Sequence, residues 1–139
     1  MSSGRLFLSV IGCLFLLFLV NYFIPIKLYK AAKAAGININ IFDLVGMRLR
    51  SVPPASIIKP LLKAHKAGLE LDHHKLEVHY LAQGDVDRVV DALIAAESRG
   101  IALNLAQASA IDLAGYNVLE SVRTGGEVLG KFDIKNKGV

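Results

Sequence analysis

Residues 6–26 contain no charged side chain, and this uninterrupted stretch lies between Arg5 and Lys27. At a rise of about 1.5 Å per residue, a helix of that length covers the roughly 30 Å of hydrocarbon in a bilayer. The mean hydropathy of the whole chain is +0.46, which is high for a protein that meets only water. The stretch predicts a membrane anchor, whose central residues are Leu14, Phe15, Leu16, Leu17, Phe18, Leu19 and Val20.

A cleaved signal peptide is the main alternative to a retained anchor, because the residues before the apolar stretch are few and basic. A signal peptide would have about 7–15 apolar residues, followed by small residues at the cleavage site. Here the stretch is longer and ends in the bulky sequence NYFIPI before Lys27. These flanks favour a retained anchor, which either spans the bilayer or forms a hairpin within one leaflet. Pro25 is expected to kink or end its helix.

The charges are unevenly distributed along the chain. Residues 1–68 contain nine Lys or Arg and one acid, whereas residues 69–139 contain seven basic and eleven acidic residues. Basic residues after the anchor outnumber those before it, so the positive-inside rule places the bulk of the chain in the cytoplasm. We predict that the juxtamembrane segment 27–50 contacts anionic lipid headgroups, at about 1 kcal/mol per basic residue. The residues expected to do so are Lys27, Lys30, Lys33, Arg48 and Arg50.

Other interpretations of this segment stay open. The basic residues could bind nucleic acid, although their closeness to the anchor makes lipid the simpler partner, or they could be a solvated helix end. The stretch 37–49 contains Phe42, Leu44, Val45 and Met47, and it is apolar enough to rest either on the membrane or on protein.

The rest of the chain repeats itself at a fixed interval. Three segments begin with glycine, continue with an alternating apolar pair and end with Asn or Asp; they are GININ at 36–40, GLELD at 68–72 and GIALN at 100–104. The glycines at 36, 68 and 100 are separated by equal intervals of 32 residues, which we call the repeat offset. At the same offset, the apolar pattern of residues 57–62 recurs at 89–94. A period of this size indicates a stack of supersecondary units.

Each repeated position has a physical role. Glycine tolerates positive φ and can end a helix, the alternating pair fits a short extended stretch, and Asn or Asp caps the next helix. After Asp85, apolar residues keep helical spacing and predict a buried stripe made of Val86, Val89, Val90, Leu93 and Ile94. Pro60 should shorten or bend the matching helix of the first unit.

These patterns predict a mainly α protein: an N-terminal transmembrane or hairpin helix, then a small helical domain. The domain would consist of helix, glycine, short strand and helix in repeats of about 32 residues, a length typical of stacked repeat units. The expected divisions are a short N-terminus at 1–5, the anchor at 6–26, the juxtamembrane segment at 27–50, the repeat domain at 51–123 and a polar tail at 124–139.

Catalytic and metal-binding patterns are absent from the sequence. One cysteine, Cys13, excludes an intramolecular disulfide and a cysteine-based zinc site. The four histidines lack zinc-ligand spacing, so His73, His74 and His79 are interpreted as surface residues. Asp112 has apolar neighbours and is expected to cap a helix or to pair. We therefore predict no enzyme activity, no metal and no cofactor.

Several segments resemble the bacterial flotillin-like proteins of the FloA type. They are IFDLVGMRLR at 41–50, LKAHKAG at 62–68, HYLA at 79–82, DRVVDALIAA at 87–96 and AIDLAG at 110–115. The similarity extends from the anchor to about residue 122. Members of this family continue into a prohibitin-like (SPFH) region and long helices. The chain therefore resembles their N-terminal portion, and we expect a truncated version: a fragment, a frameshifted gene product or a shortened relative.

The resemblance implies a scaffold of the bacterial cell membrane that self-associates, organises raft-like microdomains and affects other membrane proteins. The expected partners are therefore anionic lipids, further copies of the chain and other membrane proteins, without nucleic acid. The alternative function is a membrane-tethered helical adaptor that binds another protein.

Overall fold

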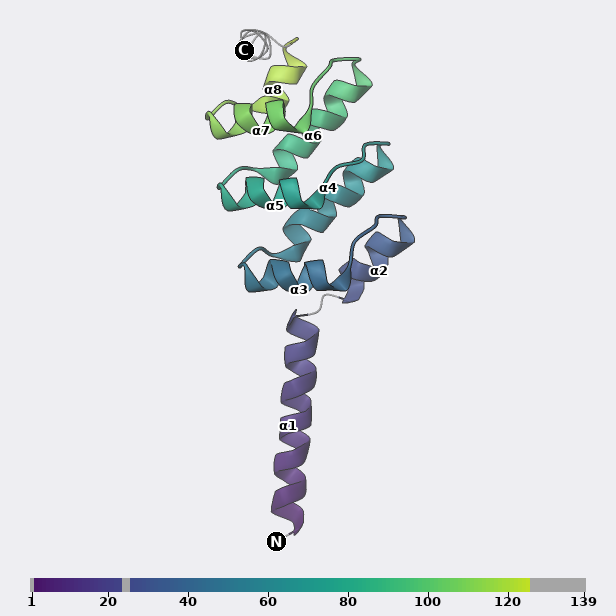
Figure 1. Cartoon of the computed structure of the whole chain (residues 1–139), viewed down its shortest axis with the longest axis vertical. Coiled ribbons are helices and arrows are strands. Elements are labelled where there is room, and N and C mark those ends of the chain that lie inside the picture. The colour runs from purple at the N-terminus through teal and green to yellow at the C-terminus, as the bar shows by residue number, and fades with distance from the viewer. Residues whose placement is uncertain (1, 24–25, 126–139) are drawn as a thin grey trace. The chain divides into compact units, whose positions relative to one another are not determined.

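The computed structural model describes residues 2–23 and 26–125, and every regular element in this part of the chain is an α-helix (Figure 1). The predicted mainly α fold is confirmed. The helices within these ranges are α1 (Ser2–Phe23), α2 (Ile26–Ala34), α3 (Ile41–Leu49), α4 (Pro54–Lys66), α5 (His73–Leu81), α6 (Val86–Ser98), α7 (Leu105–Leu113) and α8 (Val118–Arg123). The chain divides into two compact units, Met1–Pro54 (unit 1) and Ala55–Val139 (unit 2).

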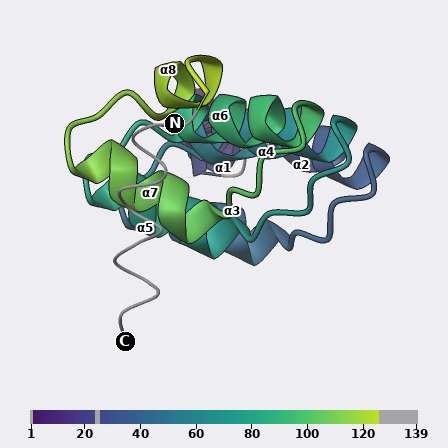
Figure 2. The ribbon, with the colours of Figure 1, turned by 90° about the horizontal axis from the view of Figure 1, so that it is seen from above.

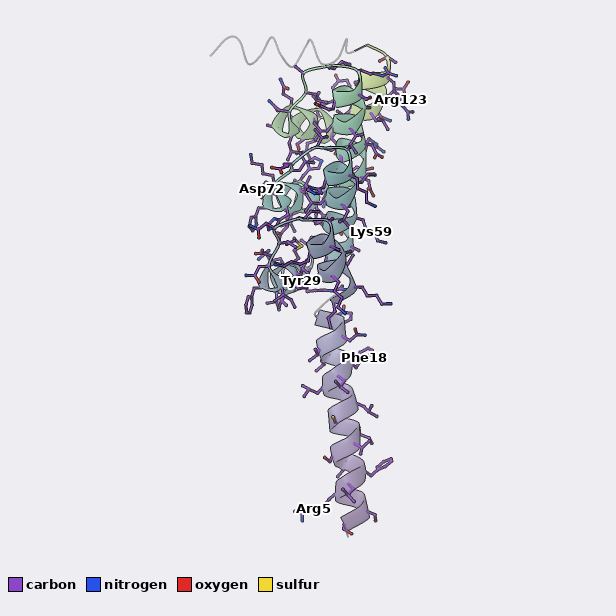
Figure 3. The ribbon with its side chains drawn as sticks, turned by 90° about the vertical axis from the view of Figure 1, so that its right-hand side faces the viewer. Arg5, Phe18, Tyr29, Lys59, Asp72 and Arg123 are labelled. Atoms are coloured by element: carbon purple, nitrogen blue, oxygen red, sulfur yellow. The ribbon has the colours of Figure 1, made fainter. Side chains whose placement is uncertain are left out.

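In unit 1, the long helix α1 exposes its side chains around its whole circumference. Phe18, for example, points away from the helix into open space (Figure 3). Among the described side chains of α1, Leu19 is half-buried and the others are exposed. The described part of this helix extends to Phe23. Pro25 itself lies outside the described residues.

The remainder of unit 1 is a short helical hairpin. Gly36 follows α2 with φ 82°, and Asn40 begins α3 by accepting a hydrogen bond from the Phe42 backbone N–H. The Asp43 carboxylate completes a capping box by accepting from the Asn40 backbone N–H at 3.1 Å. The buried apolar residues of this unit are Ala32, Ile39, Leu44, Met47 and Val52.

Unit 2 has two layers of helices. Figure 2 shows α4 and α6 in one layer and α5 and α7 in the other, and α6 packs against α5, α7 and α8. Four of the five residues in the predicted stripe of α6 are buried, and the fifth, Ile94, is half-buried. The predicted stripe is therefore largely confirmed. The central core consists of Val89, Ala92, Leu93, Ala96, Ala108, Ile111, Val118 and Val122.

Polar side chains connect α6 to its neighbours. The Lys63 ammonium in α4 lies 2.6 Å from an Asp91 oxygen and 3.3 Å from an Asp87 oxygen. The hydrogen bond to Asp91 is the main reason why the pKa of Lys63 is raised above its ordinary value. At the other end of α6, Arg99 donates to the backbone carbonyls of Val122 and Arg123 at the end of α8.

Helix boundaries recur at the repeat offset found in the sequence. Helices α3, α5 and α7 begin at residues 41, 73 and 105, and each has nine residues. The predicted caps Asn40, Asp72 and Asn104 each accept a backbone hydrogen bond from the first turn. The glycines at 36, 68 and 100 all have positive φ, between 68° and 84°. The local predictions for these glycines and caps are confirmed.

Two details differ from the sequence-based expectation. Pro60 does not shorten α4, which has 13 residues, the same number as α6. A proline inside a helix lacks the N–H that would reach the carbonyl four residues earlier, and its ring clashes with that carbonyl, so a bend of α4 stays a prediction. The expected short strands at 69–72 and 101–104 carry no strand assignment. The predicted polar tail lies outside the described residues from residue 126 onward.

Candidate membrane-contact site

α1 is long and apolar enough to cross a bilayer, and it is the one such helix in the part of the chain that the structure describes. Its 22 residues correspond to about 33 Å, compared with about 30 Å of hydrocarbon. All seven predicted anchor residues, 14–20, lie in its C-terminal half. Such a surface of leucine, phenylalanine and valine is unfavourable in water, whereas lipid tails would solvate it.

The three predicted lysines lie together on α2. Lys27, Lys30 and Lys33 are exposed, and their spacing of three residues keeps them on one half of the helix surface. The Lys33 ammonium lies 5.8 Å from the centre of the Tyr29 ring, within the range of a cation–π contact. Lys33 also occupies the last turn of α2, where a cation stabilises the helix dipole.

The two predicted arginines lie at the end of α3 and have different surroundings. The Arg48 guanidinium carbon is 4.7 Å from the centre of the Tyr22 ring, so this half-buried arginine contacts the end of α1 within unit 1. Arg50 is exposed and is the C-cap residue of α3, and its guanidinium folds back beside Gly46. Both arginines therefore lie in the same unit as the anchor helix. Their contact with headgroups stays a prediction.

The electrostatic character of unit 1 follows from this arrangement. Its basic residues are Arg5 and the five predicted headgroup residues, whereas Asp43 is its only acidic residue in the sequence. The Asp43 carboxylate is already used by the α3 capping box. A positive surface beside an apolar anchor is the charge distribution that attracts anionic leaflets.

Unit 2 contains a buried polar pair that was only partly expected. The His79 Nε2 atom of α5 lies 2.8 Å from Asp112 Oδ2 of α7, and their side chains are 2% and 4% exposed. The same carboxylate oxygen accepts from the Asp85 backbone N–H at 2.8 Å, and Arg88 lies 3.9 Å from the other oxygen. The prediction that Asp112 caps or pairs is confirmed, whereas the surface assignment of His79 is wrong.

The physical reason for the burial of His79 is its position in the repeat. At the repeat offset, His79 aligns with Met47 and Ile111, which are both buried. This alignment was the signal that could have identified His79 as a core residue. Gly84 completes the site, because a Cβ atom there would overlap the His79 imidazole ring. The pair holds α5, the start of α6 and α7 together, which is a structural role.

Comparison with known proteins identifies the family. The family model for flotillin-like protein FloA matches residues 6–128. The flotillin-like protein FloA of Dictyoglomus turgidum is 56% identical over 118 residues, which cover 84% of this chain and 36% of the relative. Those of Staphylococcus epidermidis and Staphylococcus aureus are 52% and 54% identical over 122 residues, which cover 88% of this chain and 37% of each relative. No solved structure matches.

This chain thus spans little more than a third of the length of the curated relatives that it matches. The matched residues include α1 from residue 6 onward, α2 and α3 of unit 1 and the described helices of unit 2. An N-terminal apolar helix together with this similarity indicates association with a membrane. The chain belongs to the flotillin-like FloA family.

Proposed function

We propose that this chain is a membrane-anchored scaffold component that self-associates and organises raft-like microdomains of a bacterial cell membrane. In this proposal α1 inserts into the bilayer, the basic residues of α2 and α3 contact anionic headgroups, and unit 2 faces the cytoplasm. We propose no catalytic activity for it. The observation that carries the proposal is the exposed apolar surface of α1, followed directly by the basic helix α2.

Additional support comes from the distribution of charge around the anchor and from membership of the flotillin-like family. Lys27, Lys30 and Lys33 follow the anchor, whereas Arg5 alone precedes it, and this bias favours a cytoplasmic location for unit 2. Membership of the flotillin-like FloA family supports a scaffold role. We propose self-association and microdomain organisation for the assembly that several chains would form.

The anchor is tested by Leu16→Asp. A carboxylate at the centre of a spanning helix costs about 2.5–3.5 kcal/mol on insertion scales, so the variant should move from the membrane fraction to the soluble or aggregated fraction. Leu113→Asp is the matched control, because it adds the same charge at an exposed leucine of unit 2. Unchanged partitioning of Leu16→Asp after alkaline carbonate extraction would contradict a spanning helix.

Self-association is tested separately on the wild-type chain in lipid. Chemical crosslinking in vesicles should yield species larger than a monomer, and dilution of the protein in excess lipid should reduce their yield. A chain that stays membrane-bound but monomeric at every protein-to-lipid ratio would remove the scaffold part of the proposal and leave the anchor intact.

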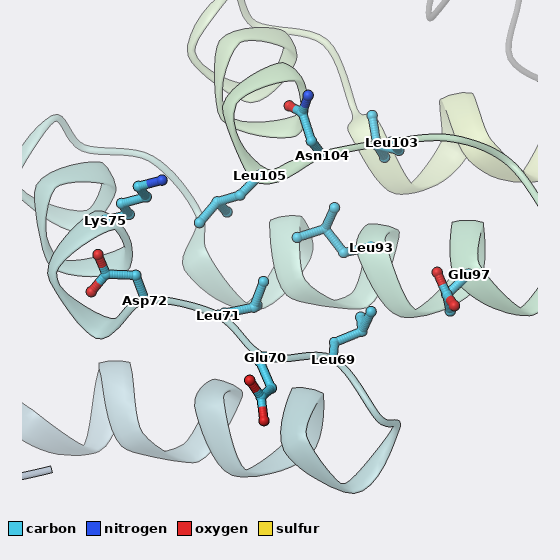
Figure 4. A pocket seen from close by; sticks show the side chains of 10 residues that line it. All are labelled: Leu69, Glu70, Leu71, Asp72, Lys75, Leu93, Glu97, Leu103, Asn104 and Leu105. Carbon is cyan, nitrogen blue, oxygen red and sulfur yellow. The ribbon is translucent and has the colours of Figure 1, made fainter. Parts of the chain in front are cut away.

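A groove in unit 2 favours the adaptor as a second candidate function. It has a volume of about 350 Å³ and lies between the segments 69–72 and 103–105 (Figure 4). Five leucines line it, and its polar residues include Glu70, Glu97 and Lys75. A partner segment with apolar side chains and a basic residue would match this combination.

Charge reversal tests the adaptor directly. Glu70→Lys together with Glu97→Lys should release a stoichiometric partner in a pull-down while membrane binding and self-association persist. Glu120→Lys is the control, because this exposed acid lies on α8 and outside the groove. Equal partner recovery with the double variant would count against the groove as its binding site.

A further inference from the structure

The two sides of α3 differ sharply in burial. Leu44 and Met47 are fully buried, whereas Phe42 and Leu49 are 76% and 71% exposed. Residues 42 and 49 are seven positions apart, which is close to two turns of an α-helix, so they share one side. Gly46 lies between them on that side and contributes no side chain. Two large apolar side chains therefore project together from a short helix.

Basic residues outnumber acidic ones in the helices around this side chain pair in the sequence. Arg48 and Arg50 lie next to Leu49 in the sequence, and α2 of the same unit carries three exposed lysines. The only acid of α3, Asp43, accepts a hydrogen bond from the helix cap. A surface with exposed apolar side chains and cations has the composition of helices that lie in the interfacial region of anionic membranes.

The position of α3 in the chain restricts what can cover this side. α1 ends at residue 23 and α3 begins at residue 41, and both belong to unit 1. Once α1 is inserted, α3 is tethered close to the bilayer surface, and a tether raises the effective concentration of a weak contact. The apolar side chains and cations of α3 match what that surface offers, namely acyl chains below anionic headgroups.

We propose that α3 is an interfacial helix that inserts Phe42 and Leu49 into the headgroup and acyl boundary of an anionic bilayer. This inference rests on the proposed function and deepens it, because it adds insertion of apolar side chains of α3 to the headgroup contact already proposed for its basic residues. The depth expected for such a helix is about 5–10 Å into the boundary region. Its buried side, with Leu44 and Met47, stays in the protein.

The absence of tryptophan from the chain allows a clean test. Phe42→Trp and Leu49→Trp each give a single fluorescent reporter in the full chain, reconstituted in phosphatidylcholine and phosphatidylglycerol vesicles with brominated acyl chains. Leu81→Trp is the matched control, because residue 81 has the position of residue 49 in the next repeat and is 51% exposed in unit 2. All three variants share the intrinsic preference of tryptophan for interfaces.

We expect brominated lipid to quench the reporters at positions 42 and 49 by about twofold or more, with a blue-shifted emission, because both lie at the acyl boundary. The reporter at position 81 should be quenched much less. Replacing phosphatidylglycerol by phosphatidylcholine should weaken the quenching at 42 and 49. Together these results would support an interfacial α3 that depends on anionic lipid.

Other outcomes would overturn the inference. Water-like emission without quenching would place α3 in solvent, and blue-shifted emission without quenching would place it against protein, such as a second copy of the chain. Equal quenching at position 81 would remove the special role of α3. Vesicle flotation of the same samples separates the two proposals: a chain that does not float fails the anchor, whereas one that floats without quenching fails only the α3 contact.

Discussion

The buried pair of His79 and Asp112 provides a strong quantitative test of unit 2. Substituting Asp112 by alanine removes the carboxylate that accepts from the His79 Nε2–H and from the Asp85 backbone N–H, both at 2.8 Å. The His79 ring would then lose its one observed partner, because its Nδ1 atom is buried without a hydrogen bond in the described part of the chain. We expect Asp112→Ala to destabilise unit 2 strongly.

The size of the effect follows from the two hydrogen bonds. A hydrogen bond to a charged group contributes about 1.5–3 kcal/mol, and the two bonds share one oxygen, so they should not be fully additive. Asp85 is exposed, and water can replace the carboxylate at its N–H, whereas His79 is too buried for that. The expected loss is therefore about 3 kcal/mol, which would lower the Tm of a unit of this size by about 12–24 °C.

The assay is thermal and urea unfolding of the reconstituted chain, followed by circular dichroism. Asp87→Ala is the control, because it also removes one aspartate, but from an exposed ion pair with Lys63. That variant should lose about 1 kcal/mol or less. A double-mutant cycle with His79→Ala isolates the coupling, which we expect to be about 1.5 kcal/mol or more. A loss as small as that of Asp87→Ala would refute the structural role of the pair.

Three smaller perturbations test other features of unit 2 by the same unfolding assay. Gly84→Ala should cost about 1–3 kcal/mol, because its Cβ must displace the fixed His79 ring; a neutral result would show that the ring can move. Gly68→Ala should cost about 1–2 kcal/mol through its φ of +84° alone, since the surrounding space is open; no loss would mean that the turn adopts another conformation. Lys63→Met should cost about 1 kcal/mol or less. Because contact with Asp91 raises the pKa of Lys63, this contribution should be complete at neutral pH and disappear as the pH rises through the raised pKa. A difference that stays unchanged at a pH well above that pKa would contradict this sign.

Local signals in the sequence predict much of this fold. The uncharged stretch predicts α1 because the length and hydropathy of a helix are local properties. The glycines with positive φ and the capping residues Asn40, Asp72 and Asn104 are predictable because each acts on backbone groups within a few residues of itself. The repeat makes these predictions stronger, because the same pattern of a glycine followed by a capping residue occurs three times along the chain.

The missed features depend on contacts between distant residues. His79 and Asp112 are 33 residues apart, and a single histidine on a short helix shows that it is buried only when it is aligned with Met47 and Ile111 of the other repeats. The division of α3 into a buried and an exposed side does not follow from the sequence either, because Phe42, Leu44 and Met47 are all apolar. Hydropathy alone cannot separate a side chain that packs on protein from one that projects outward.

The repeat also shows why exposure by itself does not identify a contact surface. Leu49, Leu81 and Leu113 occupy the same position at the repeat offset, and all three are at least half exposed. An exposed leucine at this position is therefore a property of the helix end in each repeat. Leu49 differs in its surroundings: Phe42 projects from the same side, arginines lie beside it in the sequence, and its unit contains the anchor. The inference about the membrane depends on that combination, so the same substitution at positions 49 and 81 should give different results in lipid.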